Sequence, residues 1–279
     1  MRGPAASPGL TDRVTGRSLT PHDRYFVPLF AGIVVLAWAA LGAWDLSPYA
    51  RYLDHDWTRL GLAGSLCGAL PAGDLFVPAL LYAGGWVLMT AAMMLPTTLP
   101  LAMVFRRMTA SRPDGRRLVA LLFGGYLLAW FGFGIAAHLL GMGLLGLARN
   151  SLWLTFNGWV VGFVILLMAG LFQFSPLKYR CLDGCRSPLA FVLARWSGRR
   201  PKAESLRIGF AHGVYCVGCC WLLMLLMFVV GTGSLGWMLG LGALMALEKN
   251  SRWGRRLAAP IGAGLLLAAA GVAITAPGI

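Results

Sequence analysis

Residues 212–227 read HGVYCVGCCWLLMLLM and lie within an apolar run that is long enough to cross a membrane. On a helix of about 3.6 residues per turn, positions 212, 216, 219, 220 and 227 share one face, and position 224 flanks it. Imidazole and polarizable sulfur are the ligands that soft metal ions prefer. The sequence therefore predicts a membrane-embedded site for Cu(I), with the ligands His212, Cys216, Cys219, Cys220, Met224 and Met227.

Composition sets the class of protein. Hydrophobic residues make up 58% of the 279 residues and charged residues 12%, which is typical of an integral membrane protein. We expect an all-α fold, a polytopic transmembrane helical bundle in one domain over 26–276, after a disordered cytoplasmic tail at 1–25. Seven spans are expected near residues 26–46, 76–105, 118–147, 152–174, 208–231, 234–248 and 257–276.

The positions of the cations predict the orientation. All but Arg51, Arg59 and Arg149 of the 24 lysines and arginines lie in the N-terminal tail and in three alternate loops. Basic loops stay in the cytoplasm, so the N-terminus is expected inside and the C-terminus outside. Anionic lipid headgroups are sufficient partners for the net charge of +14, and no nucleic-acid partner is expected.

A second group of thiols follows the fourth expected span. Pro176 and Pro188 bracket a segment that cannot simply continue the preceding helix. Cys181 and Cys185 are four residues apart and face the same way if the segment is helical. We expect them on the cytoplasmic side, close to where His212 enters the membrane, as further metal ligands. The residues after Pro188 predict a short helix on the cytoplasmic surface.

The second expected span carries thioethers. Met89 and Met93 share a helix face and Met94 lies beside them, while Pro96 and Pro100 should kink the helix. Counted from the cytoplasmic ends of their spans, Met93 and Cys220 both lie about 18 Å deep, so the methionines are candidate ligands beside the thiols.

Three weaker features accompany these motifs. Glu248 is a candidate ligand because a carboxylate within a membrane is costly, or it forms a neutralised pair with the adjacent Lys249. His138 is expected to be a satisfied core residue. Small residues predict close helix packing at three places in the sequence, which are Gly141/Gly143/Gly146, Gly209/Gly213 and Gly236/Gly240.

Four blocks of sequence follow one another from the second span to the sixth. They are AMMLP at 92–96, PLKYRCLDGCRSP at 176–188, CVGCCWLLM at 216–224, and Trp237-Met238 followed by Glu248-Lys249. This pattern resembles the bacterial family of predicted metal-binding integral membrane proteins, a domain of unknown function. The resemblance implies a bacterial inner-membrane location and metal-ligand roles for Cys181, Cys185, Cys216, Cys219, Cys220, Met93 and Met94. It implies no reaction.

Three functions remain open from the sequence. The first is Cu(I) binding for transport, delivery or homeostasis, with Zn(II) as the alternative ion and a metallochaperone or a membrane enzyme as the partner. The second is a membrane thiol–disulfide oxidoreductase that uses Cys216 and Cys219 as a C-x-x-C dithiol. The third is a non-catalytic assembly subunit or chaperone of a larger membrane enzyme. A non-enzymatic role is favoured over an enzymatic one.

Overall fold

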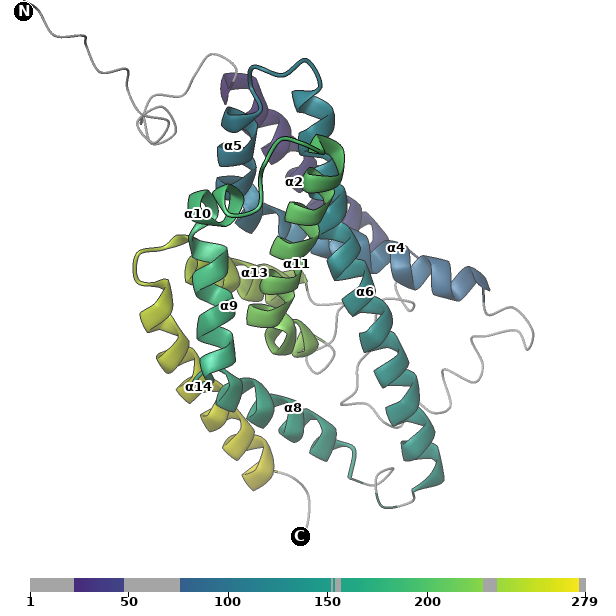
Figure 1. The fold of residues 1–279 in the computed structure, drawn as a ribbon. Helices are drawn as coiled ribbons and strands as arrows, with labels where there is room; N and C mark the ends of the chain where they lie inside the picture. The colour runs from purple at the N-terminus through teal and green to yellow at the C-terminus, as the bar shows by residue number, and fades with distance from the viewer. Residues whose placement is uncertain (1–22, 48–75, 152, 154–156, 228–234, 276–279) are drawn as a thin grey trace, which may run out of the picture.

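The computed structural model describes residues 23–47, 76–151, 153, 157–227 and 235–275, and within these ranges the chain is helical and has no strand (Figure 1). The tail at 1–22 and most of the loop at 45–75, including Cys67, lie outside the described residues. The elements are α2 (Asp23–Asp45), α4 (Phe76–Met93), η3 (Leu95–Thr98), α5 (Leu99–Met108), α6 (Gly115–Asn150), α8 (Trp159–Phe172), α9 (Pro176–Arg186), α10 (Pro188–Leu193), α11 (Pro201–Leu225), α13 (Leu235–Asn250) and α14 (Gly254–Thr275).

Four of these helices, α2, α6, α11 and α14, are long and apolar enough to cross a membrane. Two bent pairs, α4 with α5 and α8 with α9, raise the count to six if each pair forms one span. The all-helical fold is therefore confirmed over the described residues. The expected sixth span corresponds to α13, which has 16 residues, and the count of seven and the orientation stay predictions.

The first bent pair breaks next to the methionines. The chain turns by 51° between α4 and the helical segment that follows Met94. The break frees backbone carbonyls, which must find other donors inside a membrane. Thr97 Oγ1 donates to the Met94 carbonyl at 2.7 Å, Thr98 Oγ1 donates to the Leu95 carbonyl at 2.7 Å, and Tyr126 of α6 also donates to the Met94 carbonyl at 3.2 Å. The kink predicted from Pro96 is thus a short 3-10 helix stabilised by hydroxyl groups.

The second bent pair changes the expected place of Cys181 and Cys185. The chain bends by 65° between α8 and α9, and the Ser175 side chain caps α9 by accepting from the Lys178 N–H. The helix α9 then runs antiparallel to α11, because Cys181 lies against Gly218 and Gly184 against Tyr215. Cys181 is therefore beside the C-terminal half of α11, about 15 Å along that helix from Ile208 and about 9 Å from His212.

Glycines determine how closely α6 and α11 approach. A Cβ atom on Gly209 would overlap the Leu122 carbonyl, and one on Gly213 would lie 2.6 Å from the Ala129 Cβ. Close packing at Gly209 and Gly213 is thus confirmed. The prediction of close packing is wrong for Gly143, Gly146, Gly236 and Gly240, where an added Cβ would meet no described atom within 4 Å.

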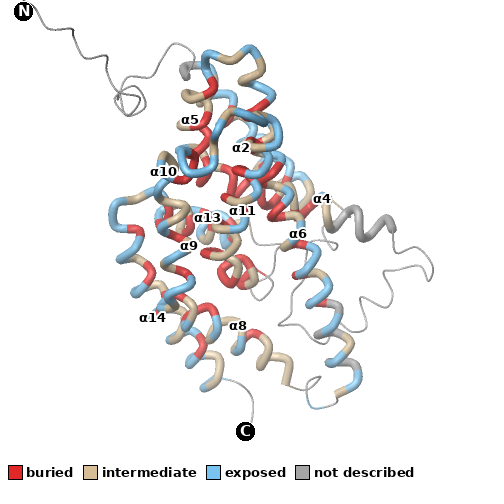
Figure 2. The backbone as a smooth tube through the Cα atoms, in the orientation of Figure 1, coloured by how far each residue is buried: buried red, intermediate tan, exposed pale blue. Residues whose placement is uncertain are grey.

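Buried residues concentrate where α4, α6, α9, α11 and α13 meet (Figure 2). This core contains the three α11 cysteines and seven methionines, namely Met89, Met93, Met94, Met224, Met227, Met238 and Met245. The short helix α10 packs against α5 and buries Phe191 and Val192. The short helix expected after Pro188 is therefore present, with its apolar face against the bundle.

Candidate metal centre

Cys216 is the meeting point of three helices. Its Sγ lies 2.9 Å from the Tyr126 hydroxyl of α6 and accepts from Lys249 Nζ of α13 at 2.7 Å. Lys249 Nζ also lies 3.8 Å from the Met94 Sδ. Cys216, Tyr126, Lys249 and Met94 are all at most 4% exposed. Tyr126 and Lys249 therefore connect Met94 of the second expected span with Cys216 of the fifth.

The two adjacent charged residues of α13 have different partners. Glu248 accepts from Lys178 Nζ of α9 at 2.8 and 2.9 Å, and Lys178 also donates to the Gln173 side chain. The exposed fractions of the Lys178 and Glu248 side chains are 0% and 1%. The interpretation of Glu248 and Lys249 as one neutralised pair is therefore wrong. Because both Glu248 oxygens face Lys178, the structure gives this carboxylate an ion-pairing role.

Four thiols lie between α9 and α11. The Sγ atoms of Cys219 and Cys220 are 3.3 Å apart, and the Cys219 thiol donates to the Cys216 carbonyl at 3.1 Å. Cys181 and Cys185 of α9 pack against the core that contains Cys219 and Cys220, and the Cys181 Sγ faces Gly218 of α11. We call Cys181, Cys185, Cys219 and Cys220 the thiol cluster. Its members are free thiols, half-buried on α9 and buried on α11.

The Cys219 and Cys220 sulfur atoms are in contact, but the thiol cluster does not form a preorganised metal site. Among the described residues, no three His, Cys, Asp or Glu side chains are placed to hold one metal ion together. Gly218 allows the approach of the two helices, because a Cβ atom there would lie 2.7 Å from the Cys181 Sγ. The thiols would therefore have to reorient before they could bind one ion together.

His212 and the remaining methionine candidates are buried side chains of α4, of α11 and of the residues just after α11. The His212 ring is 3% exposed, packs edge-on against Phe191 at 5.3 Å between centroids, and leaves its Nδ1 atom without a hydrogen bond. Met93 packs against Gly242 of α13, with contacts of 3.5–3.6 Å to the position of an added Cβ. Met89, Met224 and Met227 are buried in the same core.

Sequence reasoning missed Tyr126 and undervalued Lys178 and Lys249. A lysine within an apolar segment is a signal of function because burial of its charge is costly, and both lysines stand in the blocks that carry the family resemblance. Nothing in the sequence distinguishes Tyr126 from other aromatic residues of the third span. Its role follows only from the packing of α6 against α11.

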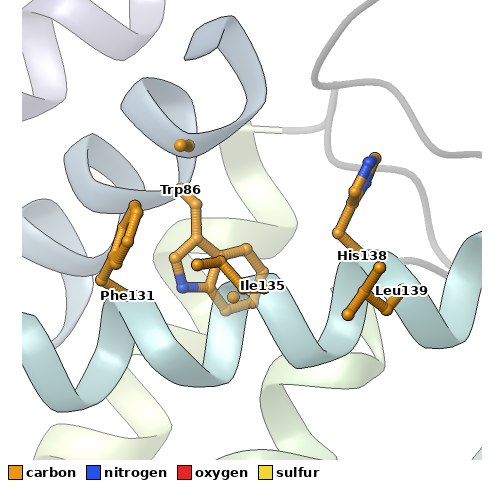
Figure 3. A pocket seen from close by; sticks show the side chains of 7 residues that line it. Trp86, Phe131, Ile135, His138 and Leu139 are labelled. Atoms are coloured by element: carbon orange, nitrogen blue, oxygen red, sulfur yellow. The ribbon is translucent and has the colours of Figure 1, made fainter. Parts of the chain in front are cut away.

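A separate apolar pocket lies between α4 and α6. It has a volume of about 140 Å³ and is lined by Trp86, Phe131, Ile135, His138 and Leu139, among others (Figure 3). Trp86 is held there by a 2.9 Å hydrogen bond from its indole N–H to the Trp130 carbonyl. His138 was expected in the core, but it is half-buried at this pocket.

The fold and this centre define a helical protein with several candidate membrane spans and a buried group of thiols, thioethers and charges. The profile of a protein family described as copper chaperone PpoB2 matches residues 83–274. The chain belongs to this family. No curated protein and no solved structure matches the chain.

Proposed function

We propose that this protein is a membrane-embedded chaperone that carries Cu(I) on the thiol cluster. The family match supports a role in copper delivery or assembly. Thiolates are soft ligands that favour Cu(I) over hard cations. The observation that carries the proposal is the convergence of four free thiols from α9 and α11, led by the 3.3 Å contact between the Cys219 and Cys220 sulfur atoms.

The two helices have different roles in this proposal. Cys181 and Cys185 are half-buried and would receive the ion or release it. Cys219 and Cys220 are 1% exposed and would hold it away from water and oxidants. Both pairs would contribute thiolates to one shared site, and the copper would enter and leave this site at the α9 pair by exchange of one thiolate for another. The packing of α9 along α11 supports such exchange, because it brings Cys181 against Gly218, next to Cys219.

In this proposal the other predicted ligands have indirect roles around the copper site. Cys216 is engaged by Lys249 and Tyr126, so we assign it to the wall of the site and not to the first pair of ligands. The thioethers of Met89, Met93, Met94, Met224 and Met227 and the ring of His212 are further soft groups along the buried path. Glu248 supports the site indirectly through Lys178.

The redox alternative has less support from the geometry. A C-x-x-C dithiol would need its two sulfur atoms to approach each other. Cys219 instead donates to the backbone carbonyl of Cys216, and its sulfur lies 3.3 Å from that of Cys220. Zn(II) remains the alternative ion, since zinc also binds cysteine and histidine.

The partner follows from the copper chaperone assignment. A chaperone must give its ion to an acceptor, so we propose a copper-requiring enzyme or a second copper carrier as the partner. We also keep the bacterial inner membrane as the proposed location, with seven spans and the N-terminus in the cytoplasm. The four to six candidate spans support a multi-pass membrane protein.

Elemental analysis after anaerobic loading tests the proposal. Detergent-purified protein is loaded with Cu(I), desalted and compared with the Cys219→Ser/Cys220→Ser variant. The matched control is Cys67→Ser, which removes a thiol that no prediction assigns to the metal. We expect the wild type and the control to retain copper and the double variant to lose it. Equal retention of copper by all three proteins would show that Cys219 and Cys220 do not bind the ion.

A further inference from the structure

The buried centre contains one positive charge that no carboxylate balances. Among the described residues, the buried charged side chains are those of Lys178, Glu248 and Lys249. Lys178 and Glu248 pair with each other at 2.8 Å, so their charges cancel. Lys249 donates instead to sulfur atoms, at 2.7 Å from Cys216 and 3.8 Å from Met94. The centre therefore presents a lysine ammonium to its sulfur groups.

Arg186 is a third cation near the centre, and it is less buried than the two lysines. Arg186 is half-buried and donates to the Glu248 carbonyl at 2.8 Å, at the C-terminal end of α13. Carbonyl groups at a helix C-terminus carry partial negative charge, which offsets a nearby cation. Lys249 is thus the buried cation that directly contacts a thiol, that of Cys216, whose carbonyl accepts from Cys219 of the thiol cluster.

A fixed positive charge discriminates between ions of different charge. At one position it repels a divalent ion twice as strongly as a monovalent ion. Two thiolates that hold Cu(I) carry one net negative charge, which Lys249 neutralises. The same thiolates with Zn(II) are neutral, so Lys249 would leave a net positive charge in a buried, weakly screened place, which is unfavourable.

We propose that Lys249 makes the thiol site selective for a monovalent soft ion, Cu(I), over divalent ions such as Zn(II). The inference rests on the copper function proposed above. Lys249 is not a metal ligand in this account. It acts through its charge, and its place is fixed by Cys216 and by the ion pair that anchors the neighbouring Glu248.

The test compares the ratio of Cu(I) to Zn(II) affinity in three proteins. Full-length wild type, Lys249→Met and Lys249→Arg are purified in detergent, and each affinity is measured anaerobically by competition with a chelator of known affinity. We expect Lys249→Met to lower the Cu(I)/Zn(II) ratio about tenfold or more, chiefly by tighter Zn(II) binding. Lys249→Arg keeps the charge and should keep the wild-type ratio.

Glu248→Gln gives a test in the opposite direction. It leaves the Lys178 charge without its carboxylate, so the Cu(I)/Zn(II) ratio should rise. Lys178→Met/Glu248→Gln removes both charges of the pair and should keep the wild-type ratio, because Lys249 is unchanged. A folded Lys249→Met protein with the wild-type ratio, or a fall of the ratio in Glu248→Gln, overturns the inference. Failure of the wild type to bind Cu(I) is a different result, because it contradicts the proposed function and not the role of Lys249 alone.

Discussion

Lys178 of α9 and Glu248 of α13 form an ion pair of 2.8 Å in which both side chains are almost completely buried. The pair connects α9, the second helix of a bent pair, to the helix that carries Lys249. It also explains how α9, which contains a lysine, can pack along the middle of α11. Attraction between the two charges and the hydrogen bond from Lys178 to Gln173 offset the loss of hydration.

Removal of one member of this pair should destabilise the protein. Lys178→Met leaves the Glu248 carboxylate buried without its partner, which costs about 3–5 kcal/mol. We expect a marked fall of the thermal unfolding temperature in detergent. The double variant Lys178→Met/Glu248→Gln removes both charges and should recover most of the loss. A single variant as stable as the wild type would show that the pair does not exist in the folded protein.

Gly209→Ala should loosen the contact between α6 and α11. The added methyl group would overlap the Leu122 carbonyl, and overpacking of this kind costs about 1–3 kcal/mol. Gly236→Ala is the matched control, because a Cβ atom there meets no described atom within 4 Å. Thermal unfolding of both variants measures the difference. Equal unfolding temperatures would contradict the close approach of the two helices.

Gly218→Ala should affect copper more than the fold. Its methyl group would lie 2.7 Å from the Cys181 sulfur, and that side chain can move aside more easily than a backbone carbonyl. We expect Cu(I) affinity to fall about tenfold, which corresponds to about 1.4 kcal/mol, with a smaller loss of stability than in Gly209→Ala. Chelator competition measures the affinity, and Gly240→Ala serves as the control. An unchanged Cu(I) affinity would show that Cys181 is not part of the copper site.

Alkylation should distinguish the cysteines of α9 from those of α11. In the metal-free protein, Cys181 and Cys185 are half-buried, whereas Cys216, Cys219 and Cys220 are each 1% exposed. We expect a maleimide to label the first two faster, because reaction needs an accessible thiol. Bound Cu(I) should protect them. Peptide mass spectrometry measures both effects, and the same labelling with and without Cu(I) would exclude Cys181 and Cys185 as ligands.

Periodicity and composition were sufficient to predict the helical class, the placement of the three α11 cysteines in one core, and a kink after Met94. These features depend on local sequence, since spacing sets a helix face and proline removes a backbone donor. The short helix after Pro188 also follows from a local pattern.

The rest depends on contacts between distant segments. The sequence could not show that α9 folds back along α11, because proline and charged residues at 176–186 are equally consistent with a surface loop. The sequence also could not identify the partners of Glu248 and Lys249. Adjacent residues on a helix point about 100° apart, so each can meet a different neighbour, and only the packing of α13 against α9 and α11 selects Lys178 and Cys216.

The most direct test is the copper content of two cysteine-pair variants, Cys181→Ser/Cys185→Ser and Cys219→Ser/Cys220→Ser, each loaded anaerobically with Cu(I) beside the wild type. If α9 and α11 share one site, removal of either pair should abolish retention of the same ion. Retention of copper at the wild-type level by either variant would contradict a site shared by the two helices.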